Sequence, residues 1–422
     1  MTASLTSGTR VRASRPLATL LLVLTVFGPI SMDLYLPALP ALTTELGAAT
    51  STAQLTVTAC LIGLAAGQLI AGPLSDRFGR RGPALIGVTA YVLVSALCAA
   101  SPTVELLITA RLVQGLAGGV GIVIAQAAGR DVYEGGRLIR FYGRLTVVGG
   151  LAAVIGPLIG GALTAILDWR GLFLLLAVIG ALILAWVALG LPESLAREDR
   201  TAAGFAVIRR DMRMLLSDRR FFGAVVAQGF VYAALFAYLS GATYVLQGVY
   251  GLSPQAYALA FGLNSAGFMV FGYLAGRFSE KWSALGTLIV GLVIAALGSV
   301  ALLIAGLASV PLAVVIVALF LLAAGTAVTS PPSTTLALAG YPQIAGTASS
   351  LLGAARFAFG GIAAPLVGVA GALSILPLGL VTSVAVAAAA VTTALLLRRP
   401  ARATASAGTT HPATEGTPTC VE

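Results

Sequence analysis

The chain contains very little charge. Asp, Glu, Lys and Arg make up only 9% of its 422 residues, and hydrophobic residues make up 58%, whereas ordinary soluble domains are about 25% charged. Histidine and lysine occur once each, and the three cysteines have neither metal-ligand nor disulfide spacing. We therefore expect no soluble fold, no metal or other cofactor and, for lack of any Ser/His/Asp or Cys/His constellation, no enzyme.

Long apolar runs take up most of the chain instead. A spanning helix needs about 20 mainly apolar residues. The runs predict an all-α integral membrane protein with twelve spans, at 17–38, 53–74, 83–101, 104–127, 140–166, 171–191, 221–247, 255–276, 284–306, 310–331, 344–367 and 373–397.

The basic residues indicate which way the spans run. If twelve spans alternate from a cytoplasmic N-terminus, all of the 25 Lys and Arg residues except Arg111, Arg170 and Arg356 fall in cytoplasmic segments or at their edges. Cytoplasmic loops carry an excess of Lys and Arg, so we expect a bacterial inner-membrane protein with both termini inside. The net charge of +10 then reflects topology and attraction to anionic lipid, and it needs no nucleic-acid partner.

The longest polar interruption divides the spans six and six. We expect a cytoplasmic N-terminus (1–16), a six-helix bundle (17–191), a cytoplasmic linker (192–220), a second six-helix bundle (221–397) and a disordered tail (398–422). In the linker, Phe205, Ile208, Met212 and Leu215 recur at helical spacing. This favours either a short helix on the inner membrane surface or a solvated linker with one amphipathic turn.

The two halves resemble each other in sequence. "GPLSDRFGRR" (72–81) and "GYLAGRFSEK" (272–281) share a glycine, an arginine and a phenylalanine, and "GPLIGG" (156–161) matches "APLVGV" (364–369). Both matches place a span opposite the sixth span after it. Parallel six-helix repeats around a central cavity are an architecture of transporters.

The loop "GPLSDRFGRRGPALIG" after the second span combines glycines for a tight turn with three arginines for the cytoplasmic headgroups. A loop that only sets topology would explain the arginines. The full spacing, with an acid able to accept from an arginine or a helix N-terminus, resembles the signature loop of the major facilitator superfamily. The resemblance implies a cytoplasmic gate made by Gly72, Asp76, Arg77, Gly79, Arg80 and Arg81.

Further segments resemble the same superfamily. "ARLVQGLAGG" (110–119) is similar to its Arg-x-x-Gln-Gly motif, and "MDLYLPALP" (32–40) to the Asp-and-Pro motif of drug efflux members. "YGLSPQAYALAFGLNSAG" (250–267) and "AGTASSLLGAARFAFGG" (345–361) resemble the bicyclomycin- and chloramphenicol-resistance (Bcr/CflA) branch. The resemblance covers about residues 17–397.

"GGLAAVIGPLIGG" (149–161) is similar to the motif associated with proton antiporters. Small residues at four-residue spacing let helices approach closely, and a proline bends a helix. The resemblance implies a role in holding the two halves closed, and plain tight packing is the alternative. The motif residues are Gly149, Gly156, Pro157, Gly160 and Gly161.

Asp33 is the only carboxylate well inside an expected span. At about 1.5 Å per residue, Asp33 and Arg111 both fall in the outer half of the membrane. Burial disfavours an ionised carboxylate and a nearby arginine favours it, so the pair would make a switchable proton-coupling site, as the resemblance also implies. The alternatives are that Asp33 snorkels to water at the outer interface and that Arg111 is a structural hydrogen-bond hub.

Other polar side chains in the spans are candidates for a substrate cavity, namely Tyr35, Gln114, Gln126, Asn264 and Arg356. Each could equally be hydrogen-bonded between helices. Arg356 lies near mid-depth, either facing the cavity or bonding carbonyls at a close helix contact. Several relatives carry a second acid one or two turns before Asp33, where this chain has Thr25 and Val26. One carboxylate against two arginines argues against strongly cationic drugs.

We therefore expect a monomeric drug/proton antiporter that exports a small, mostly apolar antibiotic-like compound, resembling chloramphenicol or bicyclomycin, by alternating access. No Gly-x4-Gly-Lys-Ser/Thr loop is present, so the proton gradient and not ATP would supply the energy. Two rival functions stay open. One is an uptake symporter for a small metabolite on the same fold, and the other is a transport-inactive membrane sensor or scaffold.

Overall fold

The computed structural model describes residues 14–196, 198, 200, 204–308, 310–338, 340–341, 344–368 and 374–397. Within these ranges the chain is almost entirely helical and contains no strand. The predicted disordered tail, with His411 and Cys420, lies outside the described residues, as does most of the predicted N-terminal segment.

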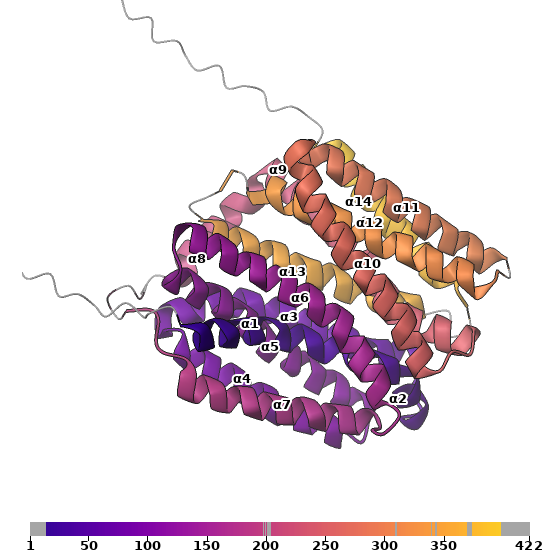
Figure 1. Ribbon diagram of the computed structural model, residues 1–422, viewed down its shortest axis with the longest axis horizontal. Helices are drawn as coiled ribbons and strands as arrows, with labels where there is room; N and C mark the ends of the chain where they lie inside the picture. Colours follow the sequence, from indigo (N-terminus) through magenta and orange to yellow (C-terminus); the bar gives the residue numbers. More distant parts are fainter. Residues whose placement is uncertain are drawn as a thin grey trace, which may run out of the picture.

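The first half of the chain forms six long helices and one short one (Figure 1). They are α1 (Arg15–Asp33), α2 (Leu39–Glu45), α3 (Thr50–Phe78), α4 (Arg81–Ala100), α5 (Val104–Val132), α6 (Gly135–Leu163) and α7 (Trp169–Gly190). A 3₁₀ turn, η1 (Leu36–Ala38), joins α1 to α2.

The second half follows a short linker helix, α8 (Gly204–Ser217). Its helices are α9 (Arg219–Tyr244), α10 (Pro254–Lys281), α11 (Ala284–Leu307), α12 (Leu312–Leu338), α13 (Ala345–Ala363) and α14 (Leu376–Thr392). Short irregular turns of helix extend three of them, η3 (Val245–Val249), η5 (Ala364–Gly368) and η6 (Thr393–Leu397).

Local sequence explains where several helices begin. Side-chain oxygens at the N-cap position accept a hydrogen bond from a backbone N–H of the first turn, which would otherwise lack a partner. The residues that do so are Ser14, Thr103, Asp168, Asp218, Ser253 and Ser283. Pro254 adds a preset backbone angle at the first position of α10.

Eleven helices among the described residues are long and apolar enough to cross a membrane. Each coincides, within a few residues, with one of the twelve expected spans. The remaining expected span, 140–166, coincides with α6, which has 29 residues but begins with Arg137, Arg140 and Arg144 and is not among the eleven. Helix α6 packs between α1 and α10, and Leu151, Ile155 and Ile159 on its other face are exposed.

Glycine lets the helices of the first half approach closely. A Cβ on Gly67 of α3 would overlap the carbonyl oxygen of Leu116, and a Cβ on Gly115 of α5 would overlap that of Cys60. Helices α11 and α12 make the equivalent contact in the second half, where a Cβ on Gly298 would collide with the backbone at Leu322. Small-residue contacts of this kind replace the hydrophobic effect inside a membrane.

The linker contains a real helix. Helix α8 has 14 residues, which is longer than the single amphipathic turn that was the alternative prediction. Leu215 is fully buried in a cluster with Phe221 of α9 and Leu352 of α13. Because α8 also packs against α3, it connects to both halves.

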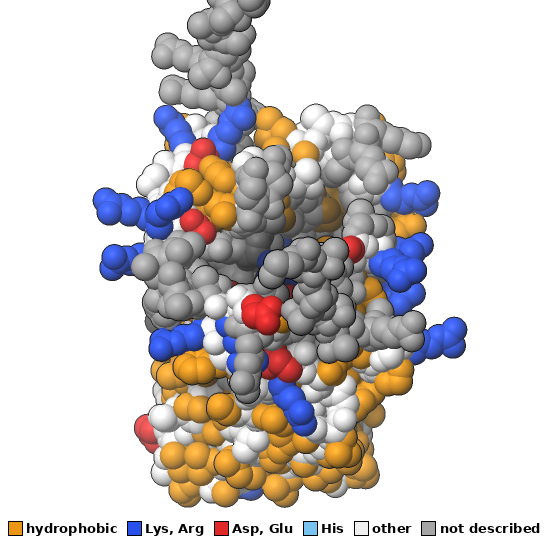
Figure 2. Space-filling view, turned by 90° about the vertical axis from the view of Figure 1, so that its left-hand side faces the viewer, with side chains coloured by type: hydrophobic (Ala, Val, Ile, Leu, Met, Phe, Trp, Pro, Cys, Tyr) orange, Lys and Arg blue, Asp and Glu red, His pale blue; other side chains and the backbone are white. Residues whose placement is uncertain are grey.

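Most exposed arginines gather at one end of the molecule, which we call the gate end because it holds the α3–α4 turn and α8. Figure 2 faces this end and shows blue side chains around its rim. The exposed arginines that the structure describes there lie near helix ends and in α8, and they are Arg15, Arg77, Arg81, Arg130, Arg137, Arg140, Arg144, Arg209, Arg210, Arg213, Arg219, Arg220 and Arg277. At the far end, where η1 and η3 lie, Arg170 pairs with Glu45 at 3.2 Å.

The two halves meet through α6–α10 and α3–α13 (Figure 1). Hydrogen bonds cross between them at the far end. The Thr43 and Tyr244 hydroxyls are 2.7 Å apart, and Thr243 donates to the Leu36 carbonyl at 3.0 Å. Gln247 donates to the Pro37 carbonyl at 3.1 Å. The far end is therefore closed by polar contacts between the halves.

Candidate functional site

Asp33 lies where α1 ends. Pro37 has no N–H to bond the Asp33 carbonyl and its ring crowds the preceding turn, and the chain tightens into η1 just beyond Asp33. Helix α6 closes over the break through two glycines. A Cβ on Gly156 would lie 2.9 Å from the Asp33 Cβ, and one on Gly160 would overlap the Leu34 carbonyl.

The Asp33 side chain is buried, with 8% of its surface exposed. It makes no hydrogen bond and no ion pair with any residue in the described part of the chain. Cys60 of α3 and Tyr257 of α10 lie within range of its charge. The Tyr257 hydroxyl is itself buried without a hydrogen-bond partner among the described residues. The site therefore places a buried carboxylate of one half within electrostatic range of a buried hydroxyl of the other.

Arg111 occupies a separate pocket inside the first half. It is fully buried, and its guanidinium carbon lies 4.4 Å from the centre of the Tyr35 ring and 5.5 Å from that of Phe173. It donates to the Gln114 side chain and, at 3.5 Å, to the Ser31 carbonyl. It reaches the backbone two residues before Asp33 without forming an ion pair with the carboxylate.

Three of the five residues expected to line a cavity are instead fully buried. Gln114 accepts from Arg111 and donates to the Ser95 hydroxyl at 2.7 Å. The Tyr35 hydroxyl is 2.9 Å from that of Thr56. Asn264 donates to the Tyr238 hydroxyl at 3.1 Å. These contacts match the alternative of hydrogen bonds between helices. The sequence left both alternatives open, because a 3.6-residue repeat places a residue on a helix without fixing the direction in which its side chain turns.

Gln126 and Arg356 are half-buried. Arg356 of α13 donates from Nη2 to the Thr334 hydroxyl at 3.0 Å. With the Gln228 amide oxygen turned toward it, Gln228 accepts from Nη2 at 2.7 Å and from Nε at 3.2 Å. The Tyr232 ring centre lies 5.0 Å from the guanidinium. Arg356 is therefore held by side chains of α9 and α12 and by no backbone carbonyl of the described chain.

The loop 72–81 forms a network around Arg80. Its guanidinium donates to Asp76 at 2.6 Å, to Ser75 at 2.7 Å and to Asp131 of α5 at 2.9 Å. The prediction that Asp76 accepts from an arginine is confirmed. Gly79 adopts φ +90°, a left-handed value that favours glycine, which confirms the need for glycine in the turn.

The sequence did not reveal three members of this network, which are Ser75, Asp131 and Glu193. The Glu193 carboxylate, just after α7, accepts from the backbone N–H of Arg80 at 2.7 Å and of Arg81 at 3.4 Å. It thereby caps the start of α4, where a negative charge is favoured by the helix dipole. The only sign of Glu193 in the sequence is that an acid directly follows a span, and this position does not reveal which residue it binds.

The antiporter motif serves two contacts. Gly156 and Gly160 accommodate α1 at Asp33, whereas Gly161 faces the other half, where a Cβ would overlap Ala258 and lie 2.9 Å from the Pro254 carbonyl of α10. Gly149 has open space where a Cβ would stand. Pro157 is buried inside a helix that continues to Leu163. The motif therefore touches both the lone carboxylate and the contact between halves.

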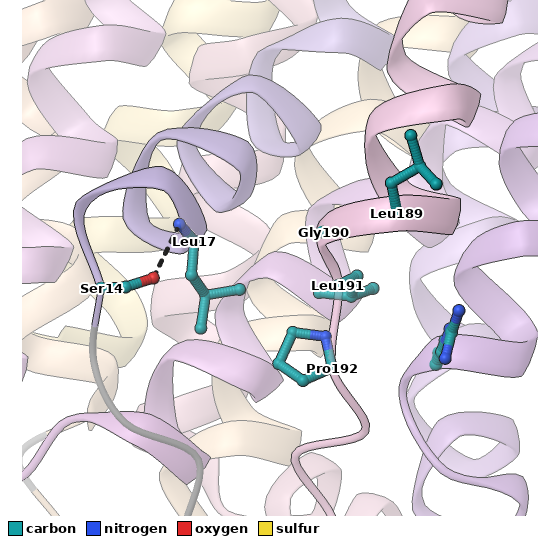
Figure 3. Close-up of a pocket in the computed structure, with 7 residues that line it drawn as sticks. Ser14, Leu17, Leu189, Gly190, Leu191 and Pro192 are labelled. Carbon is teal, nitrogen blue, oxygen red and sulfur yellow. Dashed lines mark hydrogen bonds between the residues drawn. The ribbon is translucent and has the colours of Figure 1, made fainter.

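A cavity of about 260 Å³ opens at the gate end between the ends of α1, α4 and α7 (Figure 3). It is lined by Ser14, Leu17, Arg81, Leu189, Gly190, Leu191 and Pro192. Of the predicted site residues only Arg81 borders it. Since Asp33 is at the opposite end of α1, this groove is separate from the carboxylate.

The chain that forms this helical arrangement, with its gate network and antiporter segment, is similar to known proteins. Residues 21–365 match the family model of the Major Facilitator Superfamily. The chain belongs to this superfamily. It is 36% identical over 355 residues to the uncharacterized MFS-type transporter YdgK of Bacillus subtilis, covering 84% of this chain and 88% of that one.

Other members of the superfamily that match are named for drug resistance. The bicyclomycin resistance protein homolog of Haemophilus influenzae is 29% identical, with 82% of this chain and 87% of that one covered. The chloramphenicol resistance protein of Pseudomonas aeruginosa is 30% identical, with 79% and 78% covered. These matches confirm the resemblance to the Bcr/CflA branch.

Solved structures confirm the fold. A bacterial homolog of the lysosomal transporter Spinster, in an inward-facing conformation, aligns with a TM-score of 0.71 at 17% identity and covers 90% of this chain and 96% of that one. A D-xylose-proton symporter aligns at 0.69 and 18%, with 89% and 96% covered. The chain thus has the two-bundle fold of the superfamily, and its membership of that superfamily makes it a multi-pass membrane transporter.

Proposed function

We propose that the protein is a proton-coupled exporter of small antibiotic-like compounds, with the gate end in the cytoplasm of a bacterial inner membrane. The observation that carries this proposal is Asp33, a lone buried carboxylate at the break in α1 that is packed directly against the antiporter segment at Gly156. The drug-resistance names of the relatives support the direction of transport. The arginine-rich gate end supports the orientation.

In this mechanism a proton binds Asp33 from outside and the drug leaves in exchange. An ionised carboxylate that is buried without a counter-charge is costly, so its protonation changes the energy of the contact between α1 and α6. Because Gly161 of the same helix touches α10, the change reaches the contact between the halves. The bundles 17–191 and 221–397 would then rock around the cavity as a monomer, with no cofactor beyond the proton gradient.

The residues proposed for each role follow from their positions. Arg111 holds the end of α1 through Ser31, and it would act on Asp33 through the backbone. Half-buried Gln126 and Arg356 would contact substrate in the present conformation, whereas Tyr35, Gln114 and Asn264 would do so only if the bundles rearrange. The loop 72–81 would lock the gate end.

Transport in inverted membrane vesicles tests this function. Export from the cell appears there as accumulation, so radiolabelled chloramphenicol should accumulate when the vesicle interior is acidified and should leave when a protonophore collapses the gradient. A pH-sensitive dye should report proton efflux on adding the drug. An uptake symporter would show accumulation only in right-side-out vesicles, and a sensor or scaffold would show none in either.

A further inference from the structure

Arg356 carries a charge that the second half of the chain does not balance. Among the described residues it makes no ion pair, and the acids of this half that the structure describes lie at the gate end, in α8, at the start of α9 and at the end of α10. Arginine stays protonated at any working pH. Its burial is therefore offset only by neutral partners, Gln228, Thr334 and the Tyr232 ring.

The contacts of Arg356 hold one edge of the guanidinium and leave the other free. Nε and Nη2 donate to Gln228 and Thr334, whereas Nη1 has no partner in the described part of the chain. Arg111, a structural hub, is fully buried, whereas Arg356 is only partly buried. The arrangement fixes the plane of the group and keeps donors available, which suits recognition of an oxyanion.

The Tyr232 ring contacts this donor, and two phenylalanines follow Arg356 on α13. Phe359 packs edge-on against Phe230, with ring centres 5.1 Å apart, and Phe357 lies 5.8 Å from Phe236. Phe357, Phe359 and Tyr232 are half-buried rather than enclosed. A compound held here would meet one cationic donor among apolar ring surfaces.

The cluster lies beside the seam between the halves. Gly353, one helical turn before Arg356, faces the Gln68 side chain of α3, and a Cβ on Gly353 would lie 2.5 Å from its Oε1. The Gln68 Nε2 is buried without a partner among the described residues. Arg356 itself reaches from α13 to α9 and α12, which belong to the same half as α13.

We propose that Arg356, oriented by Gln228 and Thr334, binds the carboxylate of an aromatic weak acid, so that amphiphilic monoanions are among the substrates. This rests on the proposed export function for its transport consequence, but the binding claim stands alone. The carboxylate would accept from Nη1 while its rings pack on Tyr232 and Phe357. Such a compound supplies the missing negative charge and uses the apolar surface at once.

Three probes of one skeleton test the proposal on the purified full-length protein. They are 2-naphthoate, 2-naphthamide and 2-naphthylmethylamine, which are anionic, neutral and cationic at neutral pH. Equilibrium binding should favour the naphthoate over the amide by about tenfold, with the amine weakest. Arg356→Gln should reduce this preference to about onefold, Arg356→Lys should retain part of it, and Arg277→Gln, an exposed arginine at the gate end, should leave it unchanged.

Equal affinity of the wild-type protein for naphthoate and naphthamide would overturn the proposal without any variant, so a misfolded Arg356→Gln protein cannot hide the answer. A well-folded Arg356→Gln protein that kept the naphthoate preference would also overturn it. Because binding needs no gradient, failure here is separable from failure of export. If only the carboxylate-binding proposal fails, inverted vesicles should still export neutral chloramphenicol. If the export proposal fails, they should not.

Discussion

The Asp131 carboxylate of α5 accepts two hydrogen bonds from the Arg80 guanidinium, at 2.9 Å from Nε and 3.5 Å from Nη2. The pair joins the gate-end terminus of α5 to the turn between α3 and α4. Ser194 adds a hydrogen bond to the same carboxylate at 2.8 Å. Three separate segments are thus fixed to one arginine whose side chain is only 5% exposed.

Asp131→Asn should destabilise the protein more than Asp76→Asn. The Asp131 side chain is 16% exposed and that of Asp76 38%, and losing one partner of a mostly buried charge pair costs more than losing an exposed one. We expect a loss of about 2 kcal/mol for Asp131→Asn and under about 1 kcal/mol for Asp76→Asn. Thermal unfolding in detergent would measure both, and an equal or reversed order would contradict the assignment of Asp131 as the main partner.

Asp76→Ala should slow the transport cycle more than it weakens drug binding. Asp76 contacts Arg80 at the gate end, whereas Asp33 is at the other end of α1. Its loss should therefore change how readily the gate end opens and leave the substrate site intact. Turnover in vesicles compared with the equilibrium dissociation constant would separate the two, and a large loss of affinity with normal turnover is the opposing result.

Gly79→Ala should destabilise the α3–α4 turn by about 2 kcal/mol, because φ +90° is a strained value for any residue with a Cβ. The new Cβ would also collide with the Glu193 carboxylate and displace it from the Arg80 and Arg81 amides. Gly82→Ala is a matched control, since it has open space and lies in α4. Thermal unfolding of the two variants should separate clearly, and equal melting temperatures would show that the turn tolerates a side chain.

Hydrophobicity and arginine placement predicted the helices well, because a span must satisfy its own backbone and be apolar along its length. The sequence singles out Asp33 as the only carboxylate well inside an expected span, and the glycines of 149–161 through small-residue spacing and the resemblance to the antiporter motif. It did not predict their contact with Asp33. It also did not predict that Arg111 turns to Tyr35 and away from Asp33, since both directions suit a buried arginine. The choice depends on Phe173 of α7, which is distant in the chain and completes the aromatic pocket.

Glu193 shows the same limit at the gate. The sequence shows that Glu193 follows a span. Its role depends on the packing of α7 against α4, which brings Glu193 to the start of α4. The linker helix was partly predicted from the sequence. The spacing of Leu215 and its neighbours predicted a helix, and contact with α9 and α13 makes it longer and more fixed than one amphipathic turn.

Gly161→Ala should shift the protein away from the conformation with a closed far end. Its Cβ would overlap Ala258 and press on the Pro254 carbonyl of α10, and overpacking of this kind costs about 1–3 kcal/mol. Gly149→Ala in the same helix meets open space and is the matched control. Distances between spin labels at exposed Thr44 and Val249 would report the shift. If both variants gave the wild-type distance distribution, Gly161 would have no part in the closure.

Asp33→Asn should abolish proton-coupled export while leaving the protein folded. The amide is close in size to the carboxylate and needs no new space between α1 and Gly156, and Asp33 has no described partner whose hydrogen bond would be lost. It cannot release a proton, so the energy difference between the charged and neutral site disappears. Inverted vesicles should show drug binding but no accumulation on acidifying the interior.

Glu105→Gln is the control for removing a carboxylate from a helix. Glu105 is exposed in the first turn of α5, so its variant should export like the wild type. Drug equilibration down its own gradient should persist in Asp33→Asn, because the site and the rocking of the bundles remain. A drug gradient in the Asn variant that still collapses with a protonophore would move the coupling site away from Asp33. Tyr257, within range of the same charge, would then be the next group to substitute.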